Sequence, residues 1–242
     1  CPMKIISTVP SQTELLFDLG LDNEIVGITK FCIHPQQWFN SKVRIGGTKT
    51  LNIDKILKLN PDLIIANKEE NTKEQIELLQ GHFNVFVSDI KTLSDNYSLI
   101  EKIGNLTNTN QEAKKLITKT KSALDFQPTL KNKKAVYLIW KDPYMTIGSD
   151  TFINDVLNKC GFKNLFDTQT RYPQTNLEEI KLLKPEYILL SSEPYPFKDK
   201  HIDEISKTIQ NCKVILVDGE AFSWYGSRLL KKTEYLKELS LM

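Results

Sequence analysis

The sequence of 242 residues predicts an α/β fold built from two lobes of similar plan. The main observation is an internal repeat, in which residues 52–69 (NIDKILKLNPDLIIANKE) align without a gap on residues 176–193 (NLEEIKLLKPEYILLSSE). Both copies predict the same order of features, an amphipathic helix followed by a buried strand. The length agrees, because it suits either one large α/β domain or two lobes.

Each copy of the repeat contains the signals that start and stop a helix. Asn52 and Asn176 stand at the expected N-caps, where an Asn side chain accepts a hydrogen bond from the first helical turn. Pro61 and Pro185 follow the helices, and the residue before a proline disfavours helical conformation. Branched residues after each proline predict a buried strand, so each copy is a helix-to-strand unit of a parallel sheet.

The agreement extends to both sides of the repeat. Residues 76–89 and 205–218 share a helix, a short turn and a strand followed by Asp. Upstream, residues 13–20 and 153–161 both predict a helix closed by glycine. Three landmarks in the same order favour two lobes over the alternative, a chance match within one α/β sheet.

A further helix is predicted between the lobes. Residues 111–126 have apolar residues at helical spacing and no counterpart in the other repeat. At 1.5 Å per residue this helix would span about 24 Å, enough for a stiff connector. We therefore expect an N-terminal α/β lobe at residues 1–108, a connector helix and linker at 109–130, and a C-terminal α/β lobe at 131–242.

The composition is typical of a soluble globular protein. Ten Gly, ten Pro, 40% hydrophobic and 26% charged residues exclude collagen-like and disordered chains. A net charge of +2 implies no nucleic-acid partner, because dedicated nucleic-acid binders usually carry a dense basic field. The longest apolar runs fall far short of the roughly 20 residues that a membrane span needs.

The four cysteines have neither a CxxC pair nor regular spacing, which argues against a zinc knuckle and a disulfide framework. The first residues, CPMKII, enter a predicted strand directly, so no signal segment is expected in this chain. One alternative is that Cys1 carries the lipid of a mature lipoprotein, although Ile5 and Ile6 leave little room for a polar tether.

Candidate ligand-binding residues lie in the loops that follow the predicted strands, where ligands of parallel sheets bind. They are Pro10, Cys32, His34, Lys49, Asn67, Lys68 and Glu69, followed by Trp140, Tyr144, Arg171, Tyr172, Glu193, Tyr195, Trp224, Tyr225 and Arg228. Aromatic side chains suit large, flat or amphipathic ligands, and Lys and Arg suit carboxylate or phosphate groups. The alternative is that the aromatic residues cap the core and the charges are solvated.

Cys32, His34 and Glu69 are candidate metal ligands, with Glu193 as the alternative carboxylate, since a thiolate, an imidazole and a carboxylate can form one site. The alternative is a packed Cys and a hydrogen-bonded His, because the chain has only three His and no HExxH motif. GxxxxGK[ST], GxGxxG and GxSxG are also absent, so no nucleotide site, catalytic residue or cofactor is expected.

Residues 9–35, 46–66, 146–166 and 172–192 resemble the helical-backbone (class III) substrate-binding proteins of ABC importers, and most closely their periplasmic cobalamin-binding members. The resemblance covers nearly the whole chain in the family's order. It implies two Rossmann-like lobes with parallel sheets joined by one long connector helix, and a ligand cleft between the lobes. It also implies a monomer, periplasmic or anchored to the cell envelope, that is not an enzyme and delivers a metal chelate to a membrane permease.

The ligand itself stays open. Positions that are aromatic in the cobalamin binders are His34, Thr48 and Asn67 here, so part of their corrin-contacting surface is missing. A corrinoid, a ferric siderophore and haem are the candidates, in that order. The rival hypotheses are a metal-dependent enzyme that uses Cys32, His34 and Glu69, and a receptor for a bare metal ion.

The resemblance also predicts where the permease docks, because in this family one acidic residue on each lobe contacts permease arginines. Aligning Ile76 with Ile205 places Glu74 opposite Asp203, with Glu204 adjacent. The alternative is that these acids only favour an exposed helix start through the helix dipole.

Overall fold

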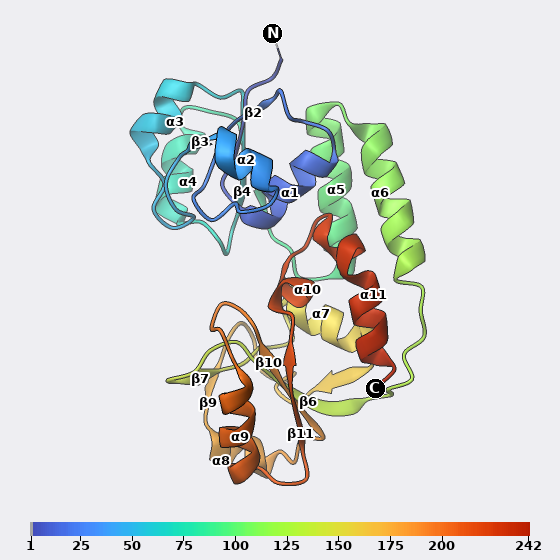
Figure 1. The fold of residues 1–242 in the computed structure, drawn as a ribbon. Coiled ribbons are helices and arrows are strands. Elements are labelled where there is room, and N and C mark those ends of the chain that lie inside the picture. Colours follow the sequence, from blue (N-terminus) through green and yellow to red (C-terminus); the bar gives the residue numbers. More distant parts are fainter. Residues whose placement is uncertain (1) are drawn as a thin grey trace. The chain divides into compact units, whose positions relative to one another are not determined.

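The computed structural model describes residues 2–242, so Cys1, the possible lipid site, lies outside the described residues. The chain divides into two compact units (Figure 1). Unit 1 extends to Ile90 and includes Asp95–Lys119 and Tyr225–Arg228, and unit 2 comprises Lys91–Ser94, Thr120–Trp224 and Leu229–Met242. Each unit contains its own parallel sheet, which confirms the predicted α/β class.

Unit 1 is built on a five-stranded parallel sheet of order β3-β2-β1-β4-β5. The strands are β1 (Ile5–Ser7), β2 (Ile25–Ile28), β3 (Val43–Arg44), β4 (Leu63–Asn67) and β5 (Val85–Ser88). The helices are α1 (Pro10–Asp18), α2 (Gln36–Ser41), α3 (Ile53–Leu59) and α4 (Lys73–Gln80), with most of α5 (Leu93–Thr107) and α6 (Asn110–Ala123). All residues of β1 and β4 are buried, as expected for central strands of a parallel sheet.

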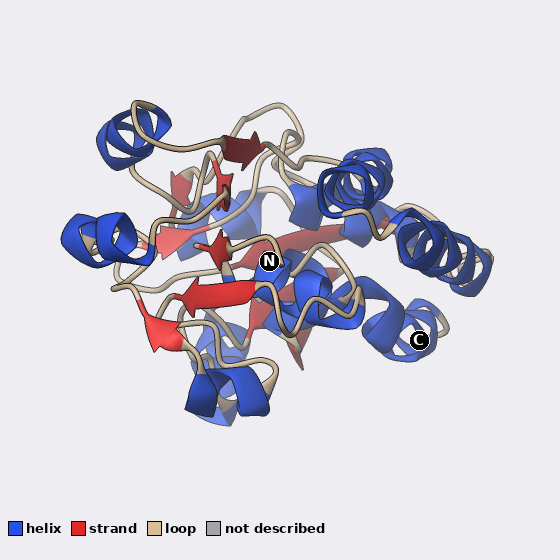
Figure 2. Ribbon diagram, turned by 90° about the horizontal axis from the view of Figure 1, so that it is seen from above, coloured by secondary structure: helices blue, strands red, loops and turns tan. Residues whose placement is uncertain are grey.

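Unit 2 is built on a four-stranded parallel sheet of order β11-β10-β6-β8 and a two-stranded antiparallel sheet of β7 and β9. The strands are β6 (Lys133–Leu138), β7 (Tyr144–Met145), β8 (Phe162–Asn164), β9 (Gln174–Thr175), β10 (Tyr187–Ser191) and β11 (Lys213–Val217). The helices are α7 (Phe152–Lys159), α8 (Leu177–Leu182), α9 (Asp199–Thr208), α10 (Gly219–Ser223) and α11 (Arg228–Ser240). Helices and strands alternate along much of the chain. Figure 2 shows the helices in blue and the strands in red, joined by loops and turns.

The predicted repeat is confirmed at the level of single hydrogen bonds. Asn52 caps α3 by accepting from the Lys55 amide at 2.9 Å, and Asn176 caps α8 by accepting from the Glu179 amide at 2.9 Å. Strands β4 and β10 follow these helices, and each pairs with the strand that comes next in the sequence, β5 or β11. The two units are therefore built from equivalent helix-to-strand units.

The two predicted glycine-closed helices are also present. Helix α1 ends before Gly20, which has a φ of +83°, and α7 ends before Gly161, which has a φ of +88°. This left-handed conformation is easily adopted only by glycine, which explains why both helices end there.

The predicted helix at residues 111–126 is observed as α6, which ends at Ala123, three residues earlier than expected. Its neighbour α5, which precedes it, was not predicted from the sequence. The two helices approach closely at Gly104, where an added Cβ would lie 2.6 Å from the Cβ of Ala113. The division between the units falls within α6, between Lys119 and Thr120.

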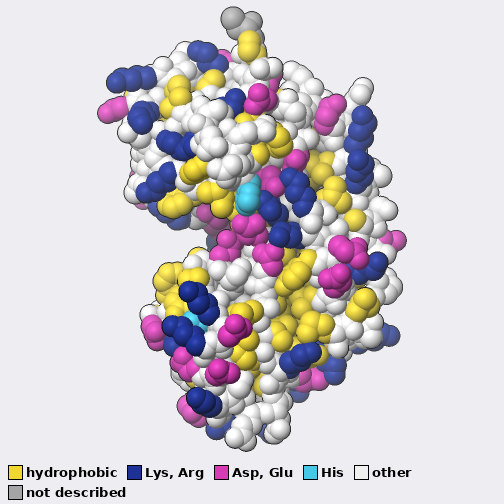
Figure 3. Space-filling view, viewed as in Figure 1, with side chains coloured by type: hydrophobic (Ala, Val, Ile, Leu, Met, Phe, Trp, Pro, Cys, Tyr) yellow, Lys and Arg dark blue, Asp and Glu magenta, His cyan; other side chains and the backbone are white. Residues whose placement is uncertain are grey.

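The surface of the protein is mixed in charge. On the face shown in Figure 3, Lys and Arg side chains are interspersed with Asp and Glu, in agreement with the totals of 32 basic and 30 acidic residues. Among residues 2–242, no helix combines the length and the apolar character required to cross a membrane.

Candidate functional site

The turn after β4 gathers four of the predicted ligand-binding residues of unit 1. The Asn67 Oδ1 accepts from the amides of Glu69 and Glu70 at 2.9 and 3.1 Å, which shapes the turn. The Lys49 ammonium donates to the Glu69 carbonyl, and the Lys68 Nζ lies 3.3 Å from the Asp89 carboxylate. Lys49 and Lys68 are exposed, so this strand-end surface presents cationic groups.

The loop after β2 buries one candidate and exposes two residues that the sequence analysis missed. The Cys32 side chain is fully buried, and its Sγ lies 3.1 Å from the hydroxyls of both Thr13 and Thr29. Burial raises the pKa of this thiol. Its neighbours Phe31 and Ile33 are 51% and 44% exposed, so the loop offers apolar surface to a ligand. Their apolar side chains within a strand-end loop were the signal available in the sequence.

The predicted metal site is not assembled. Within the described part of the chain, no group of three or more His, Cys, Asp or Glu residues could hold a metal ion. The physical reason is the position of Cys32, whose thiol is buried among threonine hydroxyls and kept neutral. His34 is half-buried in the same loop, and Pro10 is the partly exposed first residue of α1.

Unit 2 carries an aromatic cluster consisting of Trp140, Tyr195, Phe197 and His201. Trp140 follows β6 and is 40% exposed, and its ring packs against that of Tyr195 in an edge-to-face arrangement with a centroid distance of 5.7 Å. Tyr195 in turn contacts Phe197, and its hydroxyl lies 3.3 Å from the His201 Nε2. The buried side of the cluster thus supports an indole that faces solvent.

Tyr144 lies in β7, half-buried against the same hydrophobic core as Tyr195. Burial raises the pKa of its phenol to about 12, so it is neutral at physiological pH. Two further candidates lie between β8 and β9: Arg171 is exposed and lies 3.6 Å from the Asp150 carboxylate, and Tyr172 is half-buried.

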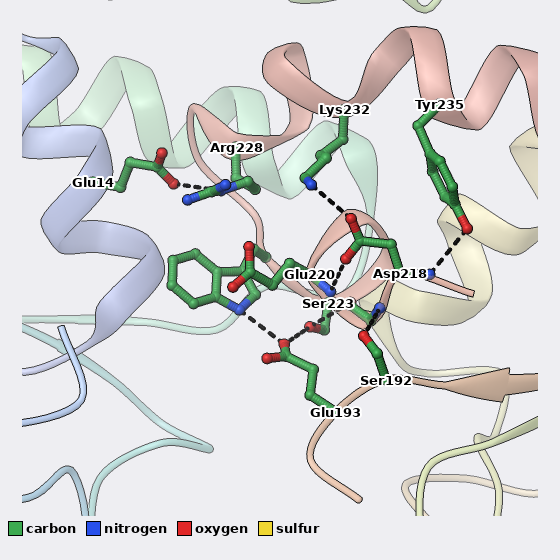
Figure 4. A network of polar contacts seen from close by, with 11 residues as sticks. Glu14, Ser192, Glu193, Asp218, Glu220, Ser223, Arg228, Lys232 and Tyr235 are labelled. Atoms are coloured by element: carbon green, nitrogen blue, oxygen red, sulfur yellow. Dashed lines mark hydrogen bonds and ion pairs between the residues drawn. The ribbon is translucent and has the colours of Figure 1, made fainter. Parts of the chain in front are cut away.

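Glu193 and Trp224 form one polar network at the ends of β10 and β11 (Figure 4). The Glu193 Oε1 accepts from the Trp224 Nε1 at 2.9 Å and from the Ser223 hydroxyl at 3.0 Å. Burial raises the pKa of the Glu193 carboxyl. Glu193 therefore orients the indole of Trp224.

Tyr225 and Arg228 are buried within unit 1. The Tyr225 hydroxyl accepts from the Gln12 Nε2 at 3.2 Å. The Arg228 Nε donates to the Glu14 carboxylate at 2.8 Å, as Figure 4 shows. Only 7% and 9% of these two residues is exposed, which favours a structural role over direct ligand contact.

The predicted docking acids are all exposed. Glu74 lies in the first turn of α4, whereas Asp203 lies in the middle of α9, which begins at Asp199. The helix-start alternative therefore does not account for Asp203. Glu204 forms an ion pair with Lys141 at 2.7 Å.

Comparisons with known proteins agree on one family. The family model described as periplasmic binding protein matches residues 5–211. An uncharacterised ABC transporter substrate-binding lipoprotein of Bacillus subtilis (strain 168) is 30% identical over 254 aligned positions, which cover 98% of this chain and 79% of the relative. A vitamin B12-binding protein of Vibrio cholerae is 30% identical over 200 positions, 78% of this chain and 70% of the relative.

A solved structure extends the likeness to nearly every residue. The crystal structure of a possible iron-binding (periplasmic solute-binding) protein from Staphylococcus epidermidis matches with a TM-score of 0.82 and 26% identity, over 98% of both chains. The sequence comparisons and the structural comparison therefore agree on the kind of protein that this chain resembles.

Proposed function

Since the chain belongs to the periplasmic binding protein family, we propose that it captures a metal chelate and delivers it to the permease of an ABC importer. Its family and relatives are substrate-binding transport proteins, so it is a binding protein and not an enzyme. We infer the ligand class from the aromatic cluster of unit 2. In this cluster Trp140 is 40% exposed, and its ring packs against that of Tyr195. An exposed indole held in this way suits a large, flat ligand.

Other strand-end residues complement the aromatic surface. In unit 1, Phe31 and Ile33 add apolar area, and Lys49 and Lys68 add cationic groups for carboxylates or phosphates of the chelate. In unit 2, Glu193 fixes the Trp224 indole through a hydrogen bond. Each unit thus has its own set of proposed ligand contacts.

We rank a corrinoid first, a ferric siderophore second and haem third. The vitamin B12-binding relative supports a corrinoid, and the possible iron-binding neighbour supports a siderophore. A bare metal ion is disfavoured because the residues described here contain no cluster of His, Cys, Asp and Glu that could hold one.

The proposed location is outside the cytoplasmic membrane, either periplasmic or anchored to the cell envelope, as the lipoprotein relative suggests. The proposed partner is a membrane permease, with the exposed acids Glu74, Asp203 and Glu204 as docking charges. We further propose that the protein is a monomer, that it binds no nucleic acid, and that α6 is the connector between the lobes.

The proposal is tested by native mass spectrometry of the protein with cyanocobalamin, a ferric siderophore and haem, each separately, and with the metal salts alone. The expected result is a 1:1 adduct with one chelate, weakened by Trp140→Ala. Leu182→Ala is the matched control, because this side chain is 80% exposed on α8 and belongs to no proposed contact. A metal that is retained without any organic chelate, and that binds unchanged in Trp140→Ala, would contradict the proposal.

A further inference from the structure

Asn71 lies in the segment between β4 and α4, and its amide is buried among the strand-end loops of unit 1. Only 4% of the residue is exposed. Its Oδ1 accepts from the Thr8 hydroxyl and from the backbone amide of Asn67, both at 2.9 Å. Its Nδ2 donates to the Thr48 carbonyl at 2.9 Å and to the Thr8 carbonyl at 3.5 Å. These contacts use the two acceptor and two donor positions that a side-chain amide offers.

The three partner residues lie at or after the carboxyl ends of three different strands of the sheet. Thr8 follows β1, Thr48 follows β3, and Asn67 is the last residue of β4. In a parallel sheet these carboxyl ends lie at the same edge, where ligands bind. One buried side chain therefore connects three loops of the surface that we assign to the ligand.

The connected loops carry the proposed ligand contacts of unit 1. Lys49 follows Thr48 directly and donates to the Glu69 carbonyl. The Asn67 Oδ1 accepts from the Glu69 backbone amide at 2.9 Å. A displacement of the Thr48 loop would move Lys49 relative to Lys68. None of these four hydrogen bonds of Asn71 is made to either lysine, so its effect on a ligand would be indirect.

We infer that Asn71 is a positioning residue, which fixes the relative placement of the Thr48 loop and the β4 turn and thereby the cationic part of the ligand-binding surface. This inference rests on the proposed function. The role requires both the accepting oxygen and the donating nitrogen of a side-chain amide. A carboxylate at this position would keep the two acceptor contacts but would place a negative oxygen against the Thr48 carbonyl.

The test compares Asn71→Asp with Asn84→Asp, which makes the same charge change at an exposed residue of unit 1. The readouts are the Kd for cyanocobalamin, or for the chelate that wild type binds, and hydrogen exchange at residues 46–50. We expect Asn71→Asp to raise the Kd about tenfold and to speed exchange of the Gly47 and Thr50 amides, each of which donates to the carbonyl of the other residue across that loop. Asn84→Asp should change neither readout.

A pH series separates positioning from a general loss of stability. Protonation of the new carboxyl restores one donor toward the Thr48 carbonyl, so the affinity of Asn71→Asp should recover toward wild type as the pH falls. Wild type and Asn84→Asp, measured over the same range, correct for other titrating groups. An affinity deficit that does not shrink at low pH would overturn the inference.

Hydrogen exchange keeps the two proposals distinguishable. If wild type binds no chelate, the proposed function fails, while exchange at residues 46–50 still tests the connection made by Asn71. Unchanged exchange in Asn71→Asp, or faster exchange with an unchanged Kd, would overturn the inference alone. If Asn71→Asp does not fold, Thr8→Val decides, since it removes the hydroxyl that donates to Asn71. An unchanged Kd in Thr8→Val would then overturn the positioning role.

Discussion

The guanidinium Nε of Arg228 lies 2.8 Å from the carboxylate of Glu14, and only 11% and 5% of the two side chains is exposed. Arg228 belongs to the short segment Tyr225–Arg228, which is part of unit 1 although the residues on both sides of it belong to unit 2. The Gly226 amide donates to the Asn96 side chain, and Tyr225 accepts from Gln12. Polar contacts with α1 and α5 thus hold this segment within unit 1.

Glu14→Ala is expected to lower the free energy of unfolding by about 3 to 5 kcal/mol, because it removes the carboxylate that the buried Arg228 guanidinium contacts. The double variant Glu14→Leu, Arg228→Met should recover most of this loss, since a buried ion pair is often replaceable by apolar residues of similar size. Urea unfolding followed by circular dichroism measures both. A single variant as stable as wild type would contradict a stabilising role for this ion pair.

This ion pair also shows what the sequence could not reveal. Arg228 was predicted to lie in a strand-end loop and to contact a ligand, but it is the first residue of α11 and is paired with a residue at the other end of the chain. The pattern of residues 218–228 contains no information about a partner that distant. Cys32 was misjudged for the same reason, because its burial depends on Thr13 in α1.

Features that depend on neighbours in sequence were predicted well. Asn caps, prolines after helices and glycines at helix ends act within about one turn, so the repeat was recognisable without the structure. Helix α5 was missed although its signals are equally local. The close approach of Gly104 in α5 to Ala113 in α6 is different, because it depends on two elements meeting in space. Packing between elements was thus the missing information.

The two helix-closing glycines should respond differently to alanine. Both have positive φ, but an added Cβ at Gly20 meets nothing within 4 Å, whereas at Gly161 it would lie 2.0 Å from the Leu130 carbonyl oxygen. Gly20→Ala should cost about 1 kcal/mol from the left-handed backbone alone. Gly161→Ala should cost at least twice as much, because the chain must also shift. Equal losses in urea unfolding would contradict the steric argument.

The two N-cap asparagines should contribute about equally to stability. Asn52→Ala and Asn176→Ala are each expected to cost about 1 kcal/mol, because the amides of Lys55 and Glu179 lose their acceptor. Asn52→Gly and Asn176→Gly serve as controls and should cost only a few tenths of a kcal/mol. Unfolding free energies of the four variants test the equivalence. A loss confined to one site would show that the repeat is not energetically symmetric.

Glu193 should make stability depend on pH with the opposite sign from an ordinary surface carboxylate. Burial raises the pKa of its carboxyl in the folded state, so its favourable contribution is fully present below the unfolded-state pKa of about 4.3 and is lost as the pH rises through the folded-state pKa. The variant Glu193→Gln keeps an acceptor for Ser223 and Trp224 but cannot ionise. Wild type should therefore lose stability relative to Glu193→Gln as the pH rises.

Glu186 provides the matched control for this experiment. Its pKa is lowered by the hydrogen bond from Lys133, so its contribution is present above the unfolded-state pKa and is lost as the pH falls. Relative to wild type, Glu193→Gln should consequently change the pH profile of urea unfolding above about pH 4.3, whereas Glu186→Gln should change it below that pH, and with the opposite sign. Parallel profiles for wild type and Glu193→Gln would mean that Glu193 is solvated in solution. In that case its hydrogen bond to Trp224 would no longer explain how the indole is held.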